Sequence, residues 1–185
     1  MHTCYTKEYF MKTQIQPTAA LAVMPVTVVA TQNGMRANFA PHGQCSTVCA
    51  SPPVIALSVI KEHETANNII ETGTFSINIP SEKLLPSVLY CGSCSGKDED
   101  KSEVFSVFYG NNPAIPLISE CPVNLACKVL QKTEINGVYT FFAEVTETLV
   151  DNSCLNGALP SVPAVSPFVC SLDGKFWAVT KELTP

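Results

Sequence analysis

The sequence has few charged residues, and its positive charge is almost entirely lysine. Charged residues make up 15% of the 185 residues, well below the quarter that is usual in globular proteins. Arg36 is the only arginine, and 11 basic residues against 16 acidic ones give a net charge of −5. Proteins that read nucleic acids present a basic stripe with bidentate arginines, so we expect no nucleic-acid partner.

Long apolar runs are also missing. No run approaches the roughly 18 residues of a transmembrane helix, so we expect no membrane partner. The apolar stretch 18–30 resembles the core of a secretion signal, but Pro25 and Thr27 interrupt it and residues 1–12 are polar. The stretch is better explained as a buried strand. We therefore expect a cytoplasmic protein with reduced thiols.

Residues that usually carry catalysis are sparse. The chain has three histidines and no nucleophile-elbow, zinc-protease or Walker A motif. Its acidic residues are scattered singly, so no carboxylate pair indicates glycoside hydrolysis. Such a chain is either non-catalytic or relies on a cofactor for bond-making, while protein groups bind and orient that cofactor. Composition leaves both possibilities open.

Cysteine, in contrast, is abundant, with nine in the chain. Cys91 and Cys94 form a C-x-x-C, but no second pair follows at zinc-finger spacing. A thioredoxin-like role would need this motif at a strand-to-helix junction, whereas here it precedes a charged loop. We predict no metal site and interpret the cysteines as small apolar residues. The alternative is a thiol- or metal-binding module that uses Cys91, Cys94, Cys121 and Cys127.

Turn signals and β-branched runs predict a mainly β chain. The 46% apolar residues indicate a globular protein, and 14 prolines against 9 glycines indicate many short elements. Asn-Gly at 33–34 and 136–137 and Asp-Gly at 173–174 are typical of hairpin turns. The predicted strand 54–60 is almost entirely apolar, which is typical of a strand buried on both faces. Strands are predicted at 23–31, 36–39, 54–60, 75–79, 123–132, 138–150, 162–170 and 176–180.

Three short helices are predicted among these strands. Thr65 can cap the first, with Ile69 and Ile70 directed inward and Gly73 supplying a left-handed end. Ser81 can cap the second. The predicted helices cover residues 66–72, 81–90 and 99–105.

This order of elements favours an antiparallel barrel over a doubly wound sheet. No internal repeat or linker is evident, and the length suits one domain with one sizeable core. We expect residues 1–185 to form that single domain, with an N-terminal extension (1–20) and a closing C-terminal segment (152–185).

Five motifs follow one another between residues 25 and 151. They are A-N-F-A-P-H with S-P-P-V (37–54), S-V with T and I (58–69), G-T-F-S-I-N-I-P (73–80), Y-C-G-S-C-S-G-K-D-E-D-K-S-E-V-F (90–105) and I-S-E-C-P-V-N-L-A-C (118–127). Together they resemble the flavin reductase-like, FMN-binding split-barrel family. The fourth is most similar to the corresponding stretch of flavoredoxins.

The resemblance implies a fold, a cofactor and an activity. The fold would be an antiparallel split β-barrel of Greek-key type with a few short helices, as a homodimer with FMN near the dimer interface. The activity would be that of an oxidoreductase, which accepts hydride from NAD(P)H at flavin N5 and passes electrons to free flavin or another acceptor. The alternative is a flavoredoxin-type electron carrier with protein redox partners and no direct reaction with NAD(P)H. No catalytic side chain is predicted, because hydride transfer to N5 needs stacking and no protein proton donor.

The resemblance also implies contacts to the FMN phosphate. Thr65 would lie at a helix start, where free amides and the helix dipole favour an anion, although a plain helix cap explains it equally well. Ile60 stands where flavoredoxins usually carry arginine, so the cation must come from Lys61, Lys97 or Lys101. The last two are equally typical of solvated surface charges. The predicted contacts in this part are Ser58, Lys61, Thr65, Ser95, Gly96, Lys97 and Lys101.

The segment 38–41 is expected to line the isoalloxazine ring. Such a ring needs N–H donors toward N5 and O4, and a positive group near N1, where reduction builds negative charge. Phe39 and Ala40 can offer amides, whereas Pro41 cannot. Without the resemblance, this segment would be interpreted as the corner of an edge strand, and His42 could face the ring or solvent. The predicted ring contacts are Asn38, Phe39, Ala40 and Pro41.

Overall fold

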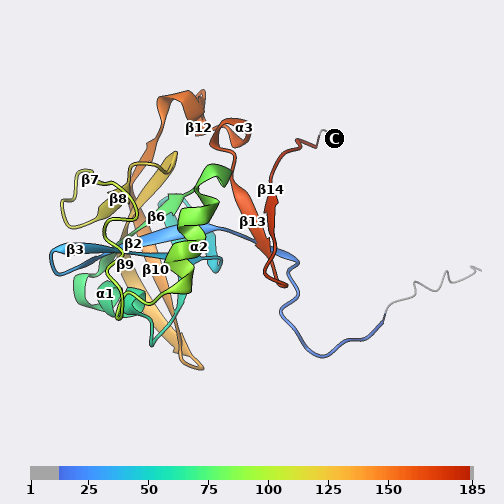
Figure 1. The fold of residues 1–185 in the computed structure, drawn as a ribbon, viewed down its shortest axis with the longest axis horizontal. Coiled ribbons are helices and arrows are strands. Elements are labelled where there is room, and N and C mark those ends of the chain that lie inside the picture. The colour runs from blue at the N-terminus through green and yellow to red at the C-terminus, as the bar shows by residue number, and fades with distance from the viewer. Residues whose placement is uncertain (1–12, 184–185) are drawn as a thin grey trace, which may run out of the picture.

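An antiparallel sheet of seven strands forms the centre of the molecule (Figure 1). The computed structural model describes residues 13–183, and the strand order in this sheet is β3-β2-β6-β9-β10-β5-β4. The predicted mainly β, antiparallel fold is therefore confirmed. The strands are β2 (Thr27–Asn33), β3 (Arg36–His42), β4 (Cys45–Ala50), β5 (Pro53–Ile60), β6 (Thr74–Ile79), β9 (Val123–Ile135) and β10 (Val138–Val150).

The strand order requires this sheet to curl. β3 and β4 lie at its two opposite edges, yet only Gly43 and Gln44 separate the end of β3 from the start of β4. Since consecutive Cα atoms are about 3.8 Å apart, these strand ends lie within roughly 11 Å of each other. The sheet therefore closes toward itself as a barrel. Because β3 and β4 are not paired in the strand order, the barrel stays split there.

Smaller sheets flank the barrel and revise two predicted strands. The predicted strand 23–31 was wrong as one element, because it divides at Val26, whose amide donates to Phe168 O. The predicted strand 162–170 was also wrong in its first half, where a helical turn ends at Ser166 in the left-handed region. The strands are β1 (Val23–Pro25), β13 (Phe168–Ser171) and β14 (Phe176–Ala178) in one sheet, β7 (Val107–Tyr109) with β8 (Pro116–Ile118), and β11 (Leu155–Asn156) with β12 (Leu159–Pro160).

The first helix begins two residues earlier than predicted. Its N-cap is His63, so Thr65 is the second helical residue rather than the cap. Ile69 is buried as expected, but Ile70 is 49% exposed and does not face inward. Gly73 ends the helix in the left-handed region with φ 68°, as predicted. The helical segments are α1 (Glu64–Thr72), η1 (Glu82–Leu84), α2 (Leu85–Ser93), η2 (Asn152–Cys154) and α3 (Val162–Val165).

The predicted helix 99–105 was wrong, whereas the predicted helix 81–90 begins after its expected cap, Ser81, as η1 and continues through α2 to Ser93. Residues 99–105 form turns and bends, since the Asp100 carboxylate accepts from the Ser102 amide and thereby competes with helical bonding. Pro86 lies in the first turn of α2, where its missing N–H costs nothing. No helix among residues 13–183 is long and apolar enough to cross a membrane.

The core lies on both sides of β2. Val29 faces the cluster inside the barrel, whereas Val28 and Ala30 face a second cluster beneath α2, as the period of two in a strand requires. β5 buries Ile55, Leu57 and Val59 on one face only, and its other face is half-buried. The expectation that β5 is buried on both faces was therefore wrong. Figure 1 shows α2 crossing in front of the sheet, and Val88 and Cys91 of this helix belong to the second cluster.

A buried amide connects four strands. The Asn78 amide group donates to Val28 O at 3.0 Å and to Ser76 Oγ at 2.9 Å. Its oxygen accepts from the Ile118 amide at 3.1 Å and from Asn124 Nδ2 at 2.8 Å. The asparagines of the third and fifth motifs thus bind β2, β6, β8 and β9 together, and their role is structural.

Candidate functional site

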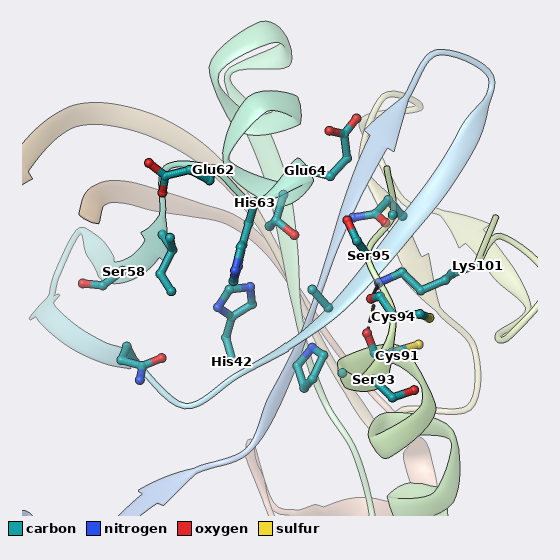
Figure 2. Close-up of a pocket in the computed structure, with 18 of the residues that line it drawn as sticks. His42, Ser58, Glu62, His63, Glu64, Cys91, Ser93, Cys94, Ser95 and Lys101 are labelled. Atoms are coloured by element: carbon teal, nitrogen blue, oxygen red, sulfur yellow. Dashed lines mark hydrogen bonds between the residues drawn. The ribbon is translucent and has the colours of Figure 1, made fainter. Parts of the chain in front are cut away.

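A cavity of about 670 Å³ opens beside the end of β3. Its walls come from residues 38–44, from 58–65 between β5 and the first turn of α1, from 91–101 after the middle of α2, and from Val138 of β10. Figure 2 shows His42 and His63 on one side of this cavity and Lys101 with Cys91 on the other. Three of the five sequence motifs therefore meet at one place.

Eight of the eleven predicted cofactor contacts line this cavity, and three do not. The side chain of Phe39 is fully buried and packs edge-on against Phe105, with ring centroids 5.3 Å apart. Lys61 and Lys97 lie outside the lining. The eight lining residues are Asn38, Ala40, Pro41, Ser58, Thr65, Ser95, Gly96 and Lys101.

The three lysines have different partners. The exposed Lys61 ammonium lies 3.1 Å from Glu134 Oε1, and its hydrogen bond to Glu134 raises the pKa of Lys61. Lys97 Nζ donates to Glu62 O. Lys101 is 4% exposed and donates to two carbonyls at the end of α2, as described next.

Lys101 both caps α2 and lines the cavity. Its Nζ donates to Cys91 O at 3.0 Å and to Cys94 O at 3.1 Å. A cation at this position satisfies carbonyls that the helix leaves unpaired and complements the negative end of the helix dipole. The loop 94–101 is thereby fixed against the end of α2 with one ammonium directed at the cavity.

Two glycines let this loop and the end of α2 approach β3. A Cβ on Gly96 would collide with Asn38 Oδ1, and a Cβ on Gly92 would lie 3.0 Å from Pro41 Cγ. A larger residue at either position would force the neighbouring side chain, Asn38 or Pro41, to shift.

His42 is the most unusual residue in the lining. It is 8% exposed, and its Nε2 is buried without a hydrogen-bond partner among the described residues. Burial, followed by the charges of His63 and Lys101, lowers the pKa of His42 to about 4. The imidazole is therefore neutral at neutral pH. A buried polar atom without a partner costs about 1–3 kcal/mol, and a ligand in the cavity would remove that cost.

Both cysteines of the C-x-x-C have raised pKa values. Burial raises the pKa of Cys91 to about 11, and Lys101 offsets part of the rise. Burial is also the largest cause that raises the pKa of Cys94. Thiol exchange and metal binding both need the thiolate. Within residues 13–183, no group of three or more His, Cys, Asp or Glu side chains could hold a metal ion.

The sequence did not decide whether His42 faces the ring or solvent, and it did not indicate a role for His63. Both residues line the cavity. His63 directly precedes the helix that Thr65 was expected to cap, and that position was the available signal. The other lining residues without a predicted role are Gln44, Ile60, Glu62, Glu64, Cys91, Gly92, Ser93, Cys94 and Val138.

The arrangement fits a flat, polar molecule with an anionic tail. The volume is within the range of about 300–1,000 Å³ that is typical of ligand sites. The first amides of α1 have no acceptor in the helix and favour an anion. β3 is an edge strand, so alternate amides along it are unused by the sheet. The lining includes side chains such as Ser58, Thr65 and Lys101, which can donate hydrogen bonds to a ligand.

Comparison with known proteins agrees with this description. The model of the family "Flavin reductase like domain" matches residues 20–161. A flavoredoxin from Methanosarcina acetivorans has a similar structure, with a TM-score of 0.91, 32% identity and 95% of each chain covered. The flavoredoxin of Desulfovibrio vulgaris (Miyazaki F) gives a TM-score of 0.87 and 28% identity, over 95% of this chain and 97% of that one.

More distant proteins support the fold alone. A flavin reductase with a split barrel domain from Shewanella frigidimarina has a TM-score of 0.79 at 17% identity, over 88% of this chain and 85% of that one. An uncharacterized protein of Archaeoglobus fulgidus is 30% identical over 97 residues, which is 51% of this chain and 55% of that protein. The matched region thus spans only about half of that curated relative.

Proposed function

Because this chain belongs to the family of flavin reductase like domains, we propose that it is an oxidoreductase that binds FMN in the cavity beside β3. Bound FMN would supply the hydride and electron chemistry that no lining side chain provides. The observation that carries the proposal is the meeting of three of the five family motifs at one cavity, which contains the orphaned Nε2 of His42. Similarity to two flavoredoxins over nearly the whole chain supports it.

The proposed phosphate end lies at the start of α1. The amides of Glu64 and Thr65 are the first two of the helix, and the Ala66 and Asn67 amides already bond to His63 O. The free amides and the helix dipole attract a phosphate, and Thr65 adds a hydroxyl. Ser95 and Gly96 would approach from the opposite wall.

The proposed ring end lies along β3. Asn38, Ala40 and Pro41 line the cavity there, and the unused amides of this edge strand are donors for the ring edge. Lys101 contributes positive charge, which would stabilise negative charge on a reduced ring. These residues bind and orient the ring, and none of them needs to donate or remove a proton.

We propose NAD(P)H as the electron donor, with free flavin or another acceptor receiving the electrons. The alternative is a carrier that exchanges electrons only with redox proteins, which the similarity to flavoredoxins favours. Mixing FMN-loaded protein with NADH or NADPH without oxygen distinguishes the two. Bleaching of the flavin absorbance within minutes supports the first proposal. An unbleached flavin that dithionite still reduces supports the carrier.

We also propose a homodimer with the cavity near its interface. Ile60, Val138 and Ile135 lie side by side on β5, β10 and β9. Ile60 and Ile135 are 47% and 71% exposed, and Ile60 and Val138 border the cavity. An exposed apolar row of this kind is typical of a subunit interface. Sedimentation equilibrium should give twice the mass of one chain, and a monomer would contradict the proposal.

We also propose that the protein is located in a reducing compartment such as the cytoplasm. All eight described cysteines are free. Free thiols persist where glutathione and thioredoxin keep them reduced. Thiol counting on protein denatured directly from cells would therefore find them unpaired.

A further inference from the structure

The cavity offers little permanent positive charge for a phosphate. Among its lining residues, Lys101 is the one lysine or arginine. An ammonium has three donors, and Lys101 uses two of them on Cys91 O and Cys94 O. Figure 2 places Lys101 across the cavity from the start of α1. The proposed phosphate end, residues 58–65, therefore has no lysine or arginine among its own lining residues.

The neighbouring cations have other partners. Lys61 pairs with Glu134 at 3.1 Å, and Lys97 donates to the backbone of Glu62. Arg36 Nη1 lies 2.6 Å from Asp100 Oδ2. None of these three lines the cavity. A phosphomonoester carries about −1.5 to −2 charges, so another positively charged group is needed beside it.

His63 lies at the start of α1, where this positive charge is needed. It is the N-cap of α1, makes no side-chain cap hydrogen bond, and lines the cavity. Its ring extends from the start of the helix toward His42 (Figure 2). His63 is exposed, so it can exchange protons with solvent. Its imidazole and the free amides of α1 can therefore face the same anion.

The second observation at this helix start is the unpartnered Nε2 of His42, which is buried on the same side of the cavity as His63. His42 stays neutral because burial opposes its charged form. It can bond a ligand but cannot supply charge.

The other charged groups near His63 do not replace it. On its own segment, the Glu64 carboxylate accepts from Asn33 Nδ2 and Asn67 Nδ2, and Glu62 adds a second negative charge beside the cavity. β3 contributes the neutral His42, and the loop after α2 contributes Lys97 and Lys101. The lining residues of β5 and β10 carry no charge. These groups are Glu62, Glu64, His42, Lys97 and Lys101.

We infer that His63 is the charged partner of the FMN phosphate, and that FMN binding adds one proton from solvent to its imidazole. This inference rests on the proposed function. Histidine is the side chain whose ordinary charge change falls between about pH 5 and 8, and an anion within about 4–6 Å favours the charged form. The ligand class is a phosphomonoester, and riboflavin, which has the same ring without phosphate, should not take up the proton.

Calorimetric titration tests the inference through the protons exchanged rather than through activity. FMN is titrated at about pH 7.5, where its phosphate is almost fully ionised, in buffers of different ionisation enthalpy. We expect uptake of close to one proton per FMN with the natural chain. We expect none with riboflavin. FMN binding without proton uptake, or equal uptake with riboflavin, would overturn the inference.

Two substitutions at the same position sharpen the test. His63→Gln should bind FMN about tenfold more weakly and without proton uptake, because a charge-assisted contact is lost. His63→Lys should restore the affinity, again without uptake, because its charge is permanent. Unchanged uptake in His63→Gln contradicts the inference. If a variant does not fold, the His63 ring resonance of the natural chain decides instead, since it must move to its protonated position when FMN is added.

These outcomes separate the two proposals. A natural chain that binds neither FMN nor riboflavin contradicts the proposed function and the inference together. A chain that binds FMN without a proton contradicts the inference only.

Discussion

Lys101 illustrates how a side chain can be recognised from sequence while its main partners are not. The flavoredoxin-like motif predicted a cation for the phosphate. In the structure its ammonium is 4% exposed and binds two carbonyls at the end of α2. The sequence could not reveal this, because the partners are backbone groups ten and seven residues away. If Lys101 is replaced, any change in FMN affinity will therefore include the effect of a less ordered loop 94–101.

Replacing Lys101 should lower stability as well as affinity. Lys101→Met leaves the Cys91 and Cys94 carbonyls without their donor, so we expect the free energy of unfolding to fall by about 2 kcal/mol. Urea denaturation without FMN measures this. Lys97→Met, in the same loop but exposed, is the matched control and should change stability by less than about 0.5 kcal/mol. Equal losses in both variants would show that the Lys101 contacts contribute nothing special.

His42 makes stability depend on pH in a defined direction. The pKa of His42 is lowered from 6.5 to about 4 in the folded chain, so the unfolded chain binds the proton more readily. Stability is therefore lost as the pH falls from about 6.5 toward 4, by up to roughly 3 kcal/mol. Urea denaturation at about pH 7 and pH 4.5 should show a smaller loss in His42→Gln than in the natural chain. The same loss in both would mean that His42 does not remain neutral on folding.

Among the elements, those set by local turns were predictable and those set by distant partners were not. Asn136 and Gly137 both have positive φ, as their sequence predicts, and they position β9 and β10 at nearly the predicted bounds. The helix expected at 99–105 fails because side chains bond to the local backbone instead. The cap assigned to Thr65 fails because the helix begins at Glu64, with His63 as its N-cap.

The buried Asn78 network explains why two motifs far from the cavity accompany the others. Asn78→Ala removes four hydrogen bonds: two that the side-chain amide donates to groups on β2 and β6, and two that its oxygen accepts from groups on β8 and β9. Each buried group left unpaired costs about 1–3 kcal/mol, so the variant should lose at least about 3 kcal/mol. Thermal and urea unfolding measure the loss. Asn67→Ala, at an exposed position of α1, is the matched control, and a comparable loss there would contradict the structural role of Asn78.

At the scale of the whole molecule, the sequence predicted which segments form the site. It did not predict which partners the charged side chains of these segments bind. Motif order indicated that residues 38–41, 58–65 and 95–101 meet, and the cavity contains members of each. The role inferred for His63 depends on the lysines being engaged elsewhere, which only the folded chain reveals. Helix and strand patterns carry no information about such partners.

We propose that residues 1–185 fold as one domain, with 152–185 closing it. β13 of the C-terminal segment pairs with β1 near the start of the chain, and Phe168 packs into the core cluster beneath α2. Of the expected N-terminal extension (1–20), residues 1–12 lie outside the described part. Residues 13–20 are exposed and contain no helix or strand (Figure 1). The closing segment is thus joined to the core by both pairing and packing.

The most direct test of the account is a titration of the purified chain with FMN, followed by flavin absorbance and fluorescence. We expect saturation at one FMN per chain, a dissociation constant of about 1 μM or tighter, and a yellow colour that survives gel filtration. A chain that leaves the flavin spectrum unchanged and emerges colourless after incubation with excess FMN would contradict the account.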